Sequence, residues 1–277
     1  MTEPFVLEKE QALSLPAWKK KDSNLIVGFT TKNGGVSEGQ FRTLNMGLHV
    51  KDSVEAVCQN KEILASHLDM PTENWVGCDQ THEDKIIKVN SQDKGKGVYS
   101  YSTALAGTDG IYTDCENILL TLCFADCVPL YFYSKEHALV GIAHAGWKGT
   151  VKNIAGNMIN RWMEDGVTID TIQVAIGPAI SAQAYIVDDH VVNRIIDALP
   201  GVEKGTYMKE VSSGQYALDL KKVNYELLLQ AGVKEKNILC SSFCTSSNES
   251  LFFSHRRDKG KTGRMMSFIG LKGADFE

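Results

Sequence analysis

The residues of this 277-residue chain best suited to chemistry are a cysteine and a histidine that lie 17 positions apart. Cys127 is the centre of the motif Ala-Asp-Cys-Val-Pro, and His144 begins the motif His-Ala-Gly-Trp. Each adjoins an apolar run with the character of a β-strand, at residues 118–124 and 138–143. Two adjacent strands can bring such side chains together at one sheet edge. The pair therefore predicts either part of a transition-metal site or a thiolate nucleophile with its base.

A second histidine extends this pair to a candidate ligand set. His82 lies between two further strand candidates, at 75–77 and 86–89. Two imidazole nitrogens and one thiolate sulfur suit zinc or copper, and three protein ligands leave a fourth position open for water or substrate. The spacing is not that of a zinc finger, so a buried thiol beside a hydrogen-bonded core histidine is the competing interpretation. The other histidines are alternative ligands, the first four of them expected in loops or on helix surfaces: His49, His67, His137, His190 and His255.

Polar and basic residues near these motifs are candidates for substrate contacts. The carboxylate of Asp126 can orient a metal-bound imidazole or act on substrate protons, although a turn aspartate that caps its own backbone is an equally good interpretation. Near the C-terminus, Arg256, Arg257 and Arg264 form a basic cluster whose guanidinium groups suit phosphate or carboxylate; the alternative is a solvated surface run. Asn45 lies in a turn-forming segment that can shape a pocket.

Strands and helices must position these residues, and hydrophobic periodicity predicts both. Strands are predicted at 25–30, 75–77, 86–89, 118–124, 129–133, 138–143, 171–176, 237–243 and 265–271. Helices are predicted at 53–68, 149–163, 189–199 and 220–231. These elements do not alternate as regular βαβ units, so a doubly wound nucleotide-binding fold fits poorly. We predict one compact α/β domain over residues 1–277, with an irregular N-terminal arm at 1–24.

Composition narrows the class of protein. With 43% hydrophobic and 23% charged residues, the chain is typical of a soluble globular protein. The net charge of −5 and the lack of a long basic block argue against nucleic-acid binding. No apolar run is long enough for a transmembrane helix, and no signal peptide is visible, so no membrane association is expected. Seven scattered cysteines indicate reduced thiols in a cytoplasmic protein. Nothing in the sequence predicts the oligomeric state.

Taken together, several segments resemble the YfiH/YlmD family, over about residues 25–270. They are Gly-Gly-Val-Ser at 34–37, Leu-Asn-Met-Gly at 44–47, Gln-Thr-His at 80–82, Ala-Asp-Cys-Val-Pro at 125–129, His-Ala-Gly-Trp-Lys-Gly at 144–149, Ala-Ile-Gly-Pro-Ala-Ile at 175–180, Cys-Thr at 244–245 and Phe-Ser-His-Arg-Arg at 253–257. The resemblance implies an α/β fold with a mixed-sheet sandwich core flanked by helices. It also implies that His82, Cys127 and His144 hold a metal ion, in agreement with the set of two nitrogens and one sulfur.

The resemblance also implies an activity, for which three interpretations compete. Members of the family have been called purine nucleoside phosphorylases, which act on adenosine, guanosine, inosine and methylthioadenosine with phosphate and also deaminate adenosine. A zinc site suits the deamination because the ion activates water, while the metal's open position or Arg256 and Arg257 would hold the phosphate. Members have also been called multicopper polyphenol oxidases (laccase domain proteins), but seven histidines, two of them in the motif, cannot readily supply a multicopper cluster.

The third interpretation is a metal-independent hydrolase or amidase that edits cell-wall precursors, with Cys127 as the nucleophile and His144 as its base. The family fold resembles that of a bacterial toxin deamidase with a Cys/His pair. We predict the first activity, with Zn²⁺ as cofactor and Cu²⁺ as the alternative ion. The expected partners are purine nucleosides and phosphate. Cys127, His144 and Asp126 are the expected catalytic residues, and Asn45, Arg256, Arg257 and Arg264 the expected substrate contacts.

Overall fold

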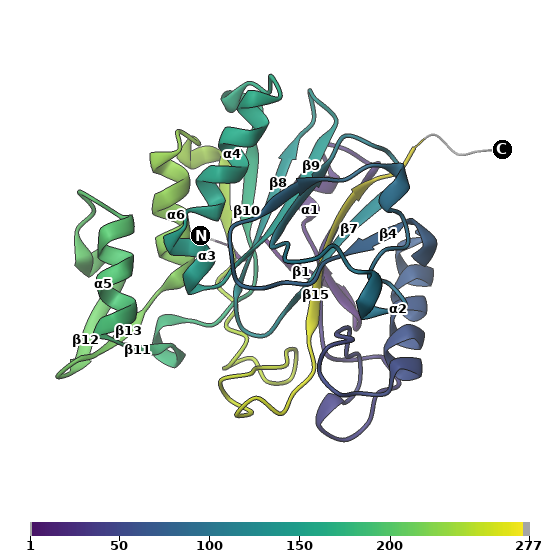
Figure 1. Cartoon of the computed structure of the whole chain (residues 1–277), viewed down its shortest axis with the longest axis horizontal. Coiled ribbons are helices and arrows are strands. Elements are labelled where there is room, and N and C mark those ends of the chain that lie inside the picture. Colours follow the sequence, from purple (N-terminus) through teal and green to yellow (C-terminus); the bar gives the residue numbers. More distant parts are fainter. Residues whose placement is uncertain (1, 274–277) are drawn as a thin grey trace.

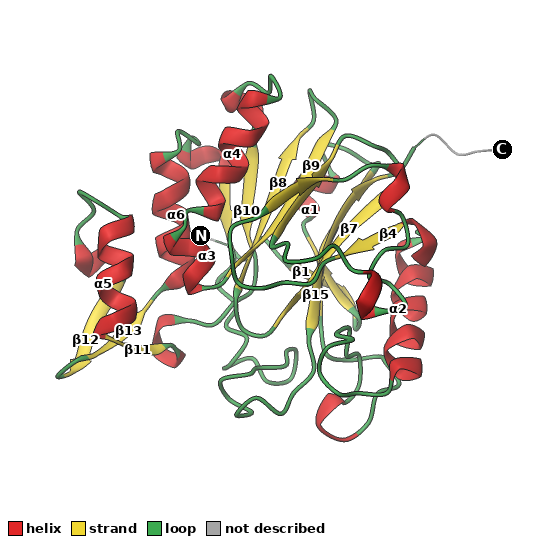
Figure 2. Cartoon of the chain, in the orientation of Figure 1, coloured by secondary structure: helices red, strands yellow, loops and turns green. Residues whose placement is uncertain are grey.

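Two six-stranded mixed β-sheets pack face to face at the centre of the computed structural model, with helices on the outer side of each (Figures 1 and 2). This is the α/β sandwich, in a single domain, that the sequence predicted. The structure describes residues 2–273, so the ends of the predicted domain 1–277 lie outside the described residues. In the part of the chain that is described, no helix is long and apolar enough to cross a membrane.

The first sheet contains the strand that leads into the cysteine motif. Its order is β1 (Val6–Lys9), β2 (Ala12–Ser14), β3 (Leu25–Thr30), β15 (Met265–Leu271), β7 (Ile118–Phe124) and β4 (Trp75–Gly77). All neighbours are antiparallel except β4 and β7. The last strand of the chain therefore lies beside β7, with Met265 opposite Phe124.

The second sheet carries the histidine motif. Its order is β14 (Ile238–Cys240), β10 (Gln173–Ile176), β8 (Val128–Ser134), β9 (Leu139–Ala145), β6 (Gly110–Thr113) and β5 (Ile86–Lys88). The central pairs β8–β9 and β6–β9 are antiparallel, whereas both outer pairs are parallel. The short turn from β7 to β8 crosses from the first sheet to the second, and so does the segment between β4 and β5.

Side-chain alternation along the strands separates the layers of the core. In β8, Tyr131 and Tyr133 pack between the two sheets, whereas Leu130 and Phe132 face the helices. The core against the outer face of the second sheet includes side chains of α4 (Ile154–Glu164) and α6 (Leu220–Gln230). Helix α2 (Val54–Leu68) packs on the outer face of the first sheet through Leu64 and Ala65. Its N-terminus is capped by Ser53, whose side chain accepts a hydrogen bond from the Ala56 N–H.

Three features differ from the sequence-based expectations. The N-terminal segment is not an irregular arm: β1 and β2 extend the first sheet and α1 (Pro16–Lys19) buries Trp18. The helix predicted at 149–163 is two helices, α3 (Trp147–Val151) and α4, because Asn153 between them has a left-handed backbone with φ of 58°. A third sheet of β11 (Ile186–Asp188), β13 (Gln215–Leu218) and β12 (Met208–Ser212), which periodicity did not reveal, lies beside α5 (Asp189–Ala198).

Candidate metal centre

Antiparallel pairing of β8 and β9 brings the two sequence motifs to the same edge of the second sheet. Pro129 is paired with His144, so Cys127, which precedes β8, lies next to the end of β9. His144 shares its side of β9 with Val140 and Ile142, whose side chains pack between the sheets. The imidazole is therefore directed toward the layer between the two sheets. Thiol and imidazole thus meet at a sheet edge as expected, but the adjacent strands are β8 and β9. The run at 118–124, expected to pair with the run at 138–143, forms β7 of the other sheet.

His82 reaches the same edge from the segment that crosses between the sheets. Its backbone is left-handed, with φ of 62°, a conformation that needs local support. The carboxylate of Asp109 provides this support by accepting hydrogen bonds from three consecutive backbone N–H groups. The N–H groups of Thr81 and Glu83 donate to Oδ2 and that of His82 to Oδ1, each at 3.0 Å.

Asp109 also orients the second imidazole. Nδ1 of His144 donates to Asp109 Oδ1 at 2.7 Å, and the backbone N–H of His144 donates to the Asp109 carbonyl oxygen at 2.7 Å. Because Nδ1 is occupied in this way, Nε2 is the ring nitrogen that can bind a metal, after losing any proton it carries, or exchange a proton. Sequence reasoning missed Asp109. No strand was predicted next to Asp109, because β6 (Gly110–Thr113), which it directly precedes, was not recognised from the sequence.

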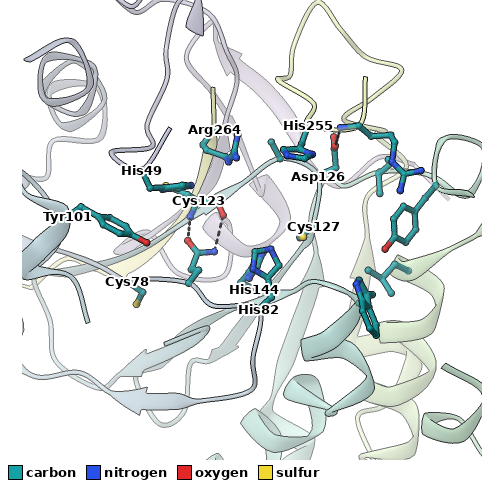
Figure 3. A pocket seen from close by; sticks show the side chains of 17 residues that line it. His49, Cys78, His82, Tyr101, Cys123, Asp126, Cys127, His144, His255 and Arg264 are labelled. Atoms are coloured by element: carbon teal, nitrogen blue, oxygen red, sulfur yellow. Dashed lines mark hydrogen bonds between the residues drawn. The ribbon is translucent and has the colours of Figure 1, made fainter. Parts of the chain in front are cut away.

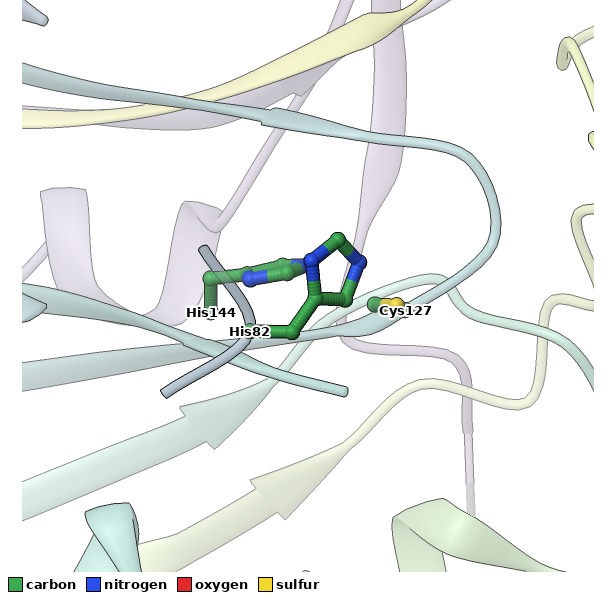
Figure 4. A group of neighbouring side chains, drawn as sticks. All are labelled: His82, Cys127 and His144. Atoms are coloured by element: carbon green, nitrogen blue, oxygen red, sulfur yellow. The ribbon is translucent and has the colours of Figure 1, made fainter. Parts of the chain in front are cut away.

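The three predicted ligands lie close enough together to bind one metal ion. Donor atoms of His82, Cys127 and His144 all lie within 4.8 Å of one another. The two imidazole rings are 4.7 Å apart between centroids at an angle of 80° (Figure 4). A side chain at Gly146 would intrude here, since its Cβ would lie 3.1 Å from His82 Cδ2 and 3.2 Å from Cys127 Sγ. The donor set, two nitrogens and one sulfur around a glycine, fits zinc or copper.

Electrostatics favour an ionised thiol at this centre. Burial alone would raise the pKa of Cys127, but the neighbouring His144 and His82 imidazoles lower it to about 6. For His144, burial acts to lower the pKa, and the Cys127 and Asp109 side chains raise it to about 9. The thiolate is the form that binds metal ions and attacks electrophiles, so this arrangement serves either chemistry.

The ligand cluster opens into a cavity of about 490 Å³, within the usual range for small-molecule sites. In Figure 3, His49, Tyr101 and Arg264 lie on one side of the cluster and Asp126 on the other, with His255 between Arg264 and Asp126. The cavity is also lined by Trp147, Ile180, Tyr185, Leu220 and Arg256. Two of the histidines considered as alternative ligands, His49 and His255, thus belong to the cavity but not to the ligand cluster.

Asp126 lines the cavity but is engaged in positioning the chain. Its Oδ1 accepts a hydrogen bond from Thr245 Oγ1 at 2.6 Å, and its Oδ2 accepts one from the backbone N–H of Arg256 at 2.9 Å. It does not contact the imidazole of His144, whose orientation depends on Asp109. The structure thus assigns to Asp109 the orienting role that the sequence suggested for Asp126.

Two of the four predicted substrate contacts do not line the cavity. Asn45 is fully buried, and its Oδ1 accepts hydrogen bonds from the backbone N–H groups of Gly47 at 3.0 Å and Arg264 at 2.8 Å. The Arg257 guanidinium donates to both Asp258 carboxylate oxygens and to backbone carbonyl groups in the same loop region. Both residues hold loops in place, whereas Arg256 and Arg264 line the cavity.

Comparison with known proteins identifies close relatives. Residues 26–272 match the sequence pattern of the family described as multi-copper polyphenol oxidoreductase laccase. The chain is 51% identical over 270 residues to purine nucleoside phosphorylase YlmD of Geobacillus stearothermophilus, covering 97% of this chain and 98% of that protein. It is 48% identical over 275 residues to the protein of the same name from Bacillus subtilis, covering 98% of each. The crystal structure of YlmD from Geobacillus stearothermophilus matches with a TM-score of 0.95 at 47% identity, covering 98% of this chain and 100% of that chain.

Proposed function

Since this chain belongs to the family described as multi-copper polyphenol oxidoreductase laccase, to which the YfiH/YlmD resemblance pointed, we propose that it is a zinc-dependent purine nucleoside phosphorylase that also deaminates adenosine. The observation that carries the proposal is the cluster of His82, Cys127 and His144 at the wall of a cavity with cationic and aromatic lining. Relatives that align over nearly the whole chain bear the name purine nucleoside phosphorylase.

The proposed ligands are suited to a single ion. Among the described residues, His82, Cys127 and His144 form the one group of three or more side chains that could hold a metal. This favours a mononuclear site over the several coppers of a multicopper oxidase. Zinc bound to these three side chains supplies a Lewis acid with one open coordination position. Asp109 holds His144 in the tautomer that such a ligand needs.

The proposed phosphorolysis exchanges one bond at C1′ of the ribose. A phosphate oxygen forms a bond to C1′ while the bond from C1′ to the base nitrogen breaks. The electron pair of that bond goes to the base, which takes up the proton of hydrogen phosphate, and the products are the free base and ribose 1-phosphate, or 5-methylthioribose 1-phosphate in the case of methylthioadenosine. In the second reaction, water adds at C6 of adenosine and ammonia leaves, giving inosine. Adenosine, guanosine, inosine and methylthioadenosine are the proposed substrates.

The decisive experiment combines metal analysis with product analysis. The purified protein should contain about one zinc per chain and should convert adenosine to adenine and ribose 1-phosphate only when phosphate is present. Without phosphate, inosine should still form. Chelation should abolish both reactions and added zinc should restore them. Absence of any purine product under all these conditions would overturn the proposal.

Replacement of a proposed ligand gives the matching variant test. Cys127→Ser should lower the zinc content because a hydroxyl is a much weaker zinc ligand than a thiolate. Cys58→Ser, on the outer helix α2, is the matched control and should retain zinc and activity. Unchanged zinc content in Cys127→Ser would remove Cys127 from the ligand set.

One observation favours a second candidate function, a thiol hydrolase. The cysteine with a lowered pKa, the adjacent imidazole and the carboxylate behind it are the parts of a Cys-His-Asp triad. Turnover of an amide substrate that resists chelation and is lost when Cys127 is alkylated would support this function. Under the zinc proposal, bound zinc should instead protect Cys127 from iodoacetamide.

A further inference from the structure

One end of the cavity holds a guanidinium group that forms no ion pair with any described residue. We propose that Arg264, together with His49, forms the subsite for free phosphate, and that the aromatic end of the same cavity receives the purine base. This inference rests on the proposed phosphorolysis and specifies where its two substrates bind.

The guanidinium group of Arg264 is the first part of the argument. The side chain is only partly exposed, yet within residues 2–273 no carboxylate lies within the 4.0 Å of an ion pair. Its Nη1 donates to the carbonyl oxygens of Thr262 at 3.1 Å and Gly263 at 3.0 Å. No described residue accepts from its Nη2 or Nε. Since charges withdrawn from water are normally paired, the missing partner is an anion supplied by a ligand.

The chain around Arg264 is built to hold it at this position. Arg264 directly precedes β15, so the pairing of β15 with β7 places it at the sheet edge where the cysteine turn begins. Its backbone N–H is fixed by Asn45, and Gly47 leaves room for its side chain. A Cβ at position 47 would lie 2.8 Å from Arg264 Cγ. Asn45 and the Leu-Asn-Met-Gly turn therefore act on the site through Arg264.

His49 adds a second hydrogen-bonding group on the same side of the metal ligands (Figure 3). The Cβ at position 47 that would touch Arg264 would also lie 3.4 Å from His49 Cε1, so the two side chains flank the same glycine. The His49 ring is 5.6 Å from that of Tyr101. The Tyr101 hydroxyl donates to Asp79, so among His49, Tyr101 and Arg264 it is the arginine and the histidine that can hold phosphate oxygens.

The side of the cavity at Asp126 has a different character. The backbone N–H of Ile180 donates to the Asp126 carbonyl oxygen at 3.1 Å, and the Tyr185 ring stacks with Arg256, whose backbone N–H donates to the Asp126 carboxylate. Trp147 and Leu220 also line the cavity. Arg256 is also there, but it is exposed, its Cζ lies 5.0 Å from the centre of the Tyr185 ring, and its Nη1 donates to the Ile186 carbonyl oxygen at 3.0 Å. This guanidinium is solvated and stacked. Flat aromatic and apolar surface is what a purine ring requires, so Arg256 belongs with the base and Arg264 with the phosphate.

The test is calorimetric titration of the zinc-loaded protein with inorganic phosphate, followed by steady-state kinetics with adenosine. Arg264→Gln should raise the Kd for phosphate about 10- to 100-fold, the range for loss of a charge-assisted hydrogen bond. It should raise the KM for phosphate similarly and leave the KM for adenosine near its original value. Arg264→Lys keeps the positive charge but loses the two-pronged guanidinium group, so its Kd for phosphate should lie between those of the unmodified protein and Arg264→Gln. His49→Ala should weaken phosphate binding less than Arg264→Gln does.

Two further arginine variants complete the design. Arg256→Gln should raise the KM for adenosine and leave phosphate binding unchanged. Arg194→Gln, on the exposed face of α5, is the matched control and should change neither constant. Zinc content and the thermal unfolding temperature verify that each variant is folded. If Arg264→Gln does not fold, Arg264→Lys and His49→Ala carry the test.

Three results would overturn the inference. The first is that folded Arg264→Gln binds phosphate as tightly as the unmodified protein. The second is that Arg256→Gln loses more phosphate affinity than Arg264→Gln, and the third is that Arg264 is needed to bind adenosine 5′-monophosphate while inorganic phosphate does not bind. The outcomes separate the two levels of the proposal. Arg264-dependent phosphate binding without phosphorolysis would leave the anion subsite standing and refute the reaction. Phosphorolysis with an unchanged KM for phosphate in Arg264→Gln would support the reaction and refute the anion subsite.

Discussion

At the scale of single residues, Asp109 links the two histidines of the candidate centre. Its carboxylate accepts from Nδ1 of His144 and from the backbone N–H groups around His82, so one side chain sets the position of two proposed ligands. The burial that would raise its pKa is outweighed by the His144 imidazole and by the backbone donors, which together lower the pKa. The carboxylate therefore stays ionised and polarises the imidazole toward a stronger metal ligand.

Replacing Asp109 by asparagine should weaken metal binding without removing any ligand. We expect Asp109→Asn to lower zinc affinity by roughly 10- to 100-fold, the range found for such outer partners of ligating histidines. Competition with a chromophoric chelator measures this change. Asp197→Asn, on the exposed side of α5, is the matched control and should bind zinc as the unmodified protein does. Equal affinities in both variants would show that Asp109 does not support the ligands.

At the scale of elements, the break between α3 and α4 lets the short helix α3 stay close to the segment that carries His82. A Cβ at Gly149 in α3 would lie 2.8 Å from the carbonyl oxygen of Glu83. After Val151 the chain changes direction at Asn153, and α4 continues along the outer face of the second sheet. The Asn153 side chain then accepts a hydrogen bond from the Gly156 N–H at 3.0 Å and caps α4.

Asn153 is therefore a point where stability can be tested. Asn153→Ala should lower the free energy of unfolding by about 2 kcal/mol, because the cap is lost and alanine is forced into a left-handed conformation. Asn153→Gly keeps the conformation accessible and should cost only a few tenths of a kcal/mol. Urea unfolding followed by circular dichroism compares the two. If the two variants have the same free energy of unfolding, the left-handed backbone of residue 153 is not the cause of the destabilisation by alanine.

At the scale of the whole molecule, the proposed metal joins the two sheets. His82 lies on a segment that passes from the first sheet to the second, and Cys127 lies on the turn from β7 to β8, which makes the same crossing. His144 is the fixed member, at the end of a central strand of the second sheet. An ion held by all three residues would bind the folded chain and not the unfolded one, so it should stabilise the whole domain.

Zinc should therefore raise the unfolding temperature. At a free zinc concentration about 100 times Kd the gain is about 2.7 kcal/mol, which for a domain of this size corresponds to roughly 5–8 °C. Differential scanning calorimetry of the chelated and zinc-loaded protein measures it. The shift should be largely lost in Cys127→Ser and retained in Cys58→Ser. Identical unfolding temperatures with and without zinc would contradict a metal site that joins the sheets.

The sequence by itself determined the central strands and the proposed metal ligands. Residues 118–124 and 265–271 were predicted to the residue, because long apolar runs report burial on both faces of a strand. Cys127 and His144 could be paired because each motif adjoins such a strand. His82 was found for the same reason, between two strand candidates. In each case the signal is local, since the chemistry-bearing side chain lies within a few residues of a recognisable element.

Only the tertiary structure decided which polar residues serve the site. Asp109 reaches His144 across 35 positions, and Asn45 reaches Arg264 across 219. Such hydrogen bonds depend on strand register and on the packing of one sheet against the other, and periodicity along the chain carries no record of either. Sequence periodicity likewise could not show that Asn45 and Arg257 support loops or that His49 lines the cavity, because these positions also depend on how the sheets pack. The sequence determined the donor atoms that can bind a metal, and the fold decided which side chains orient those donors and which can meet a substrate.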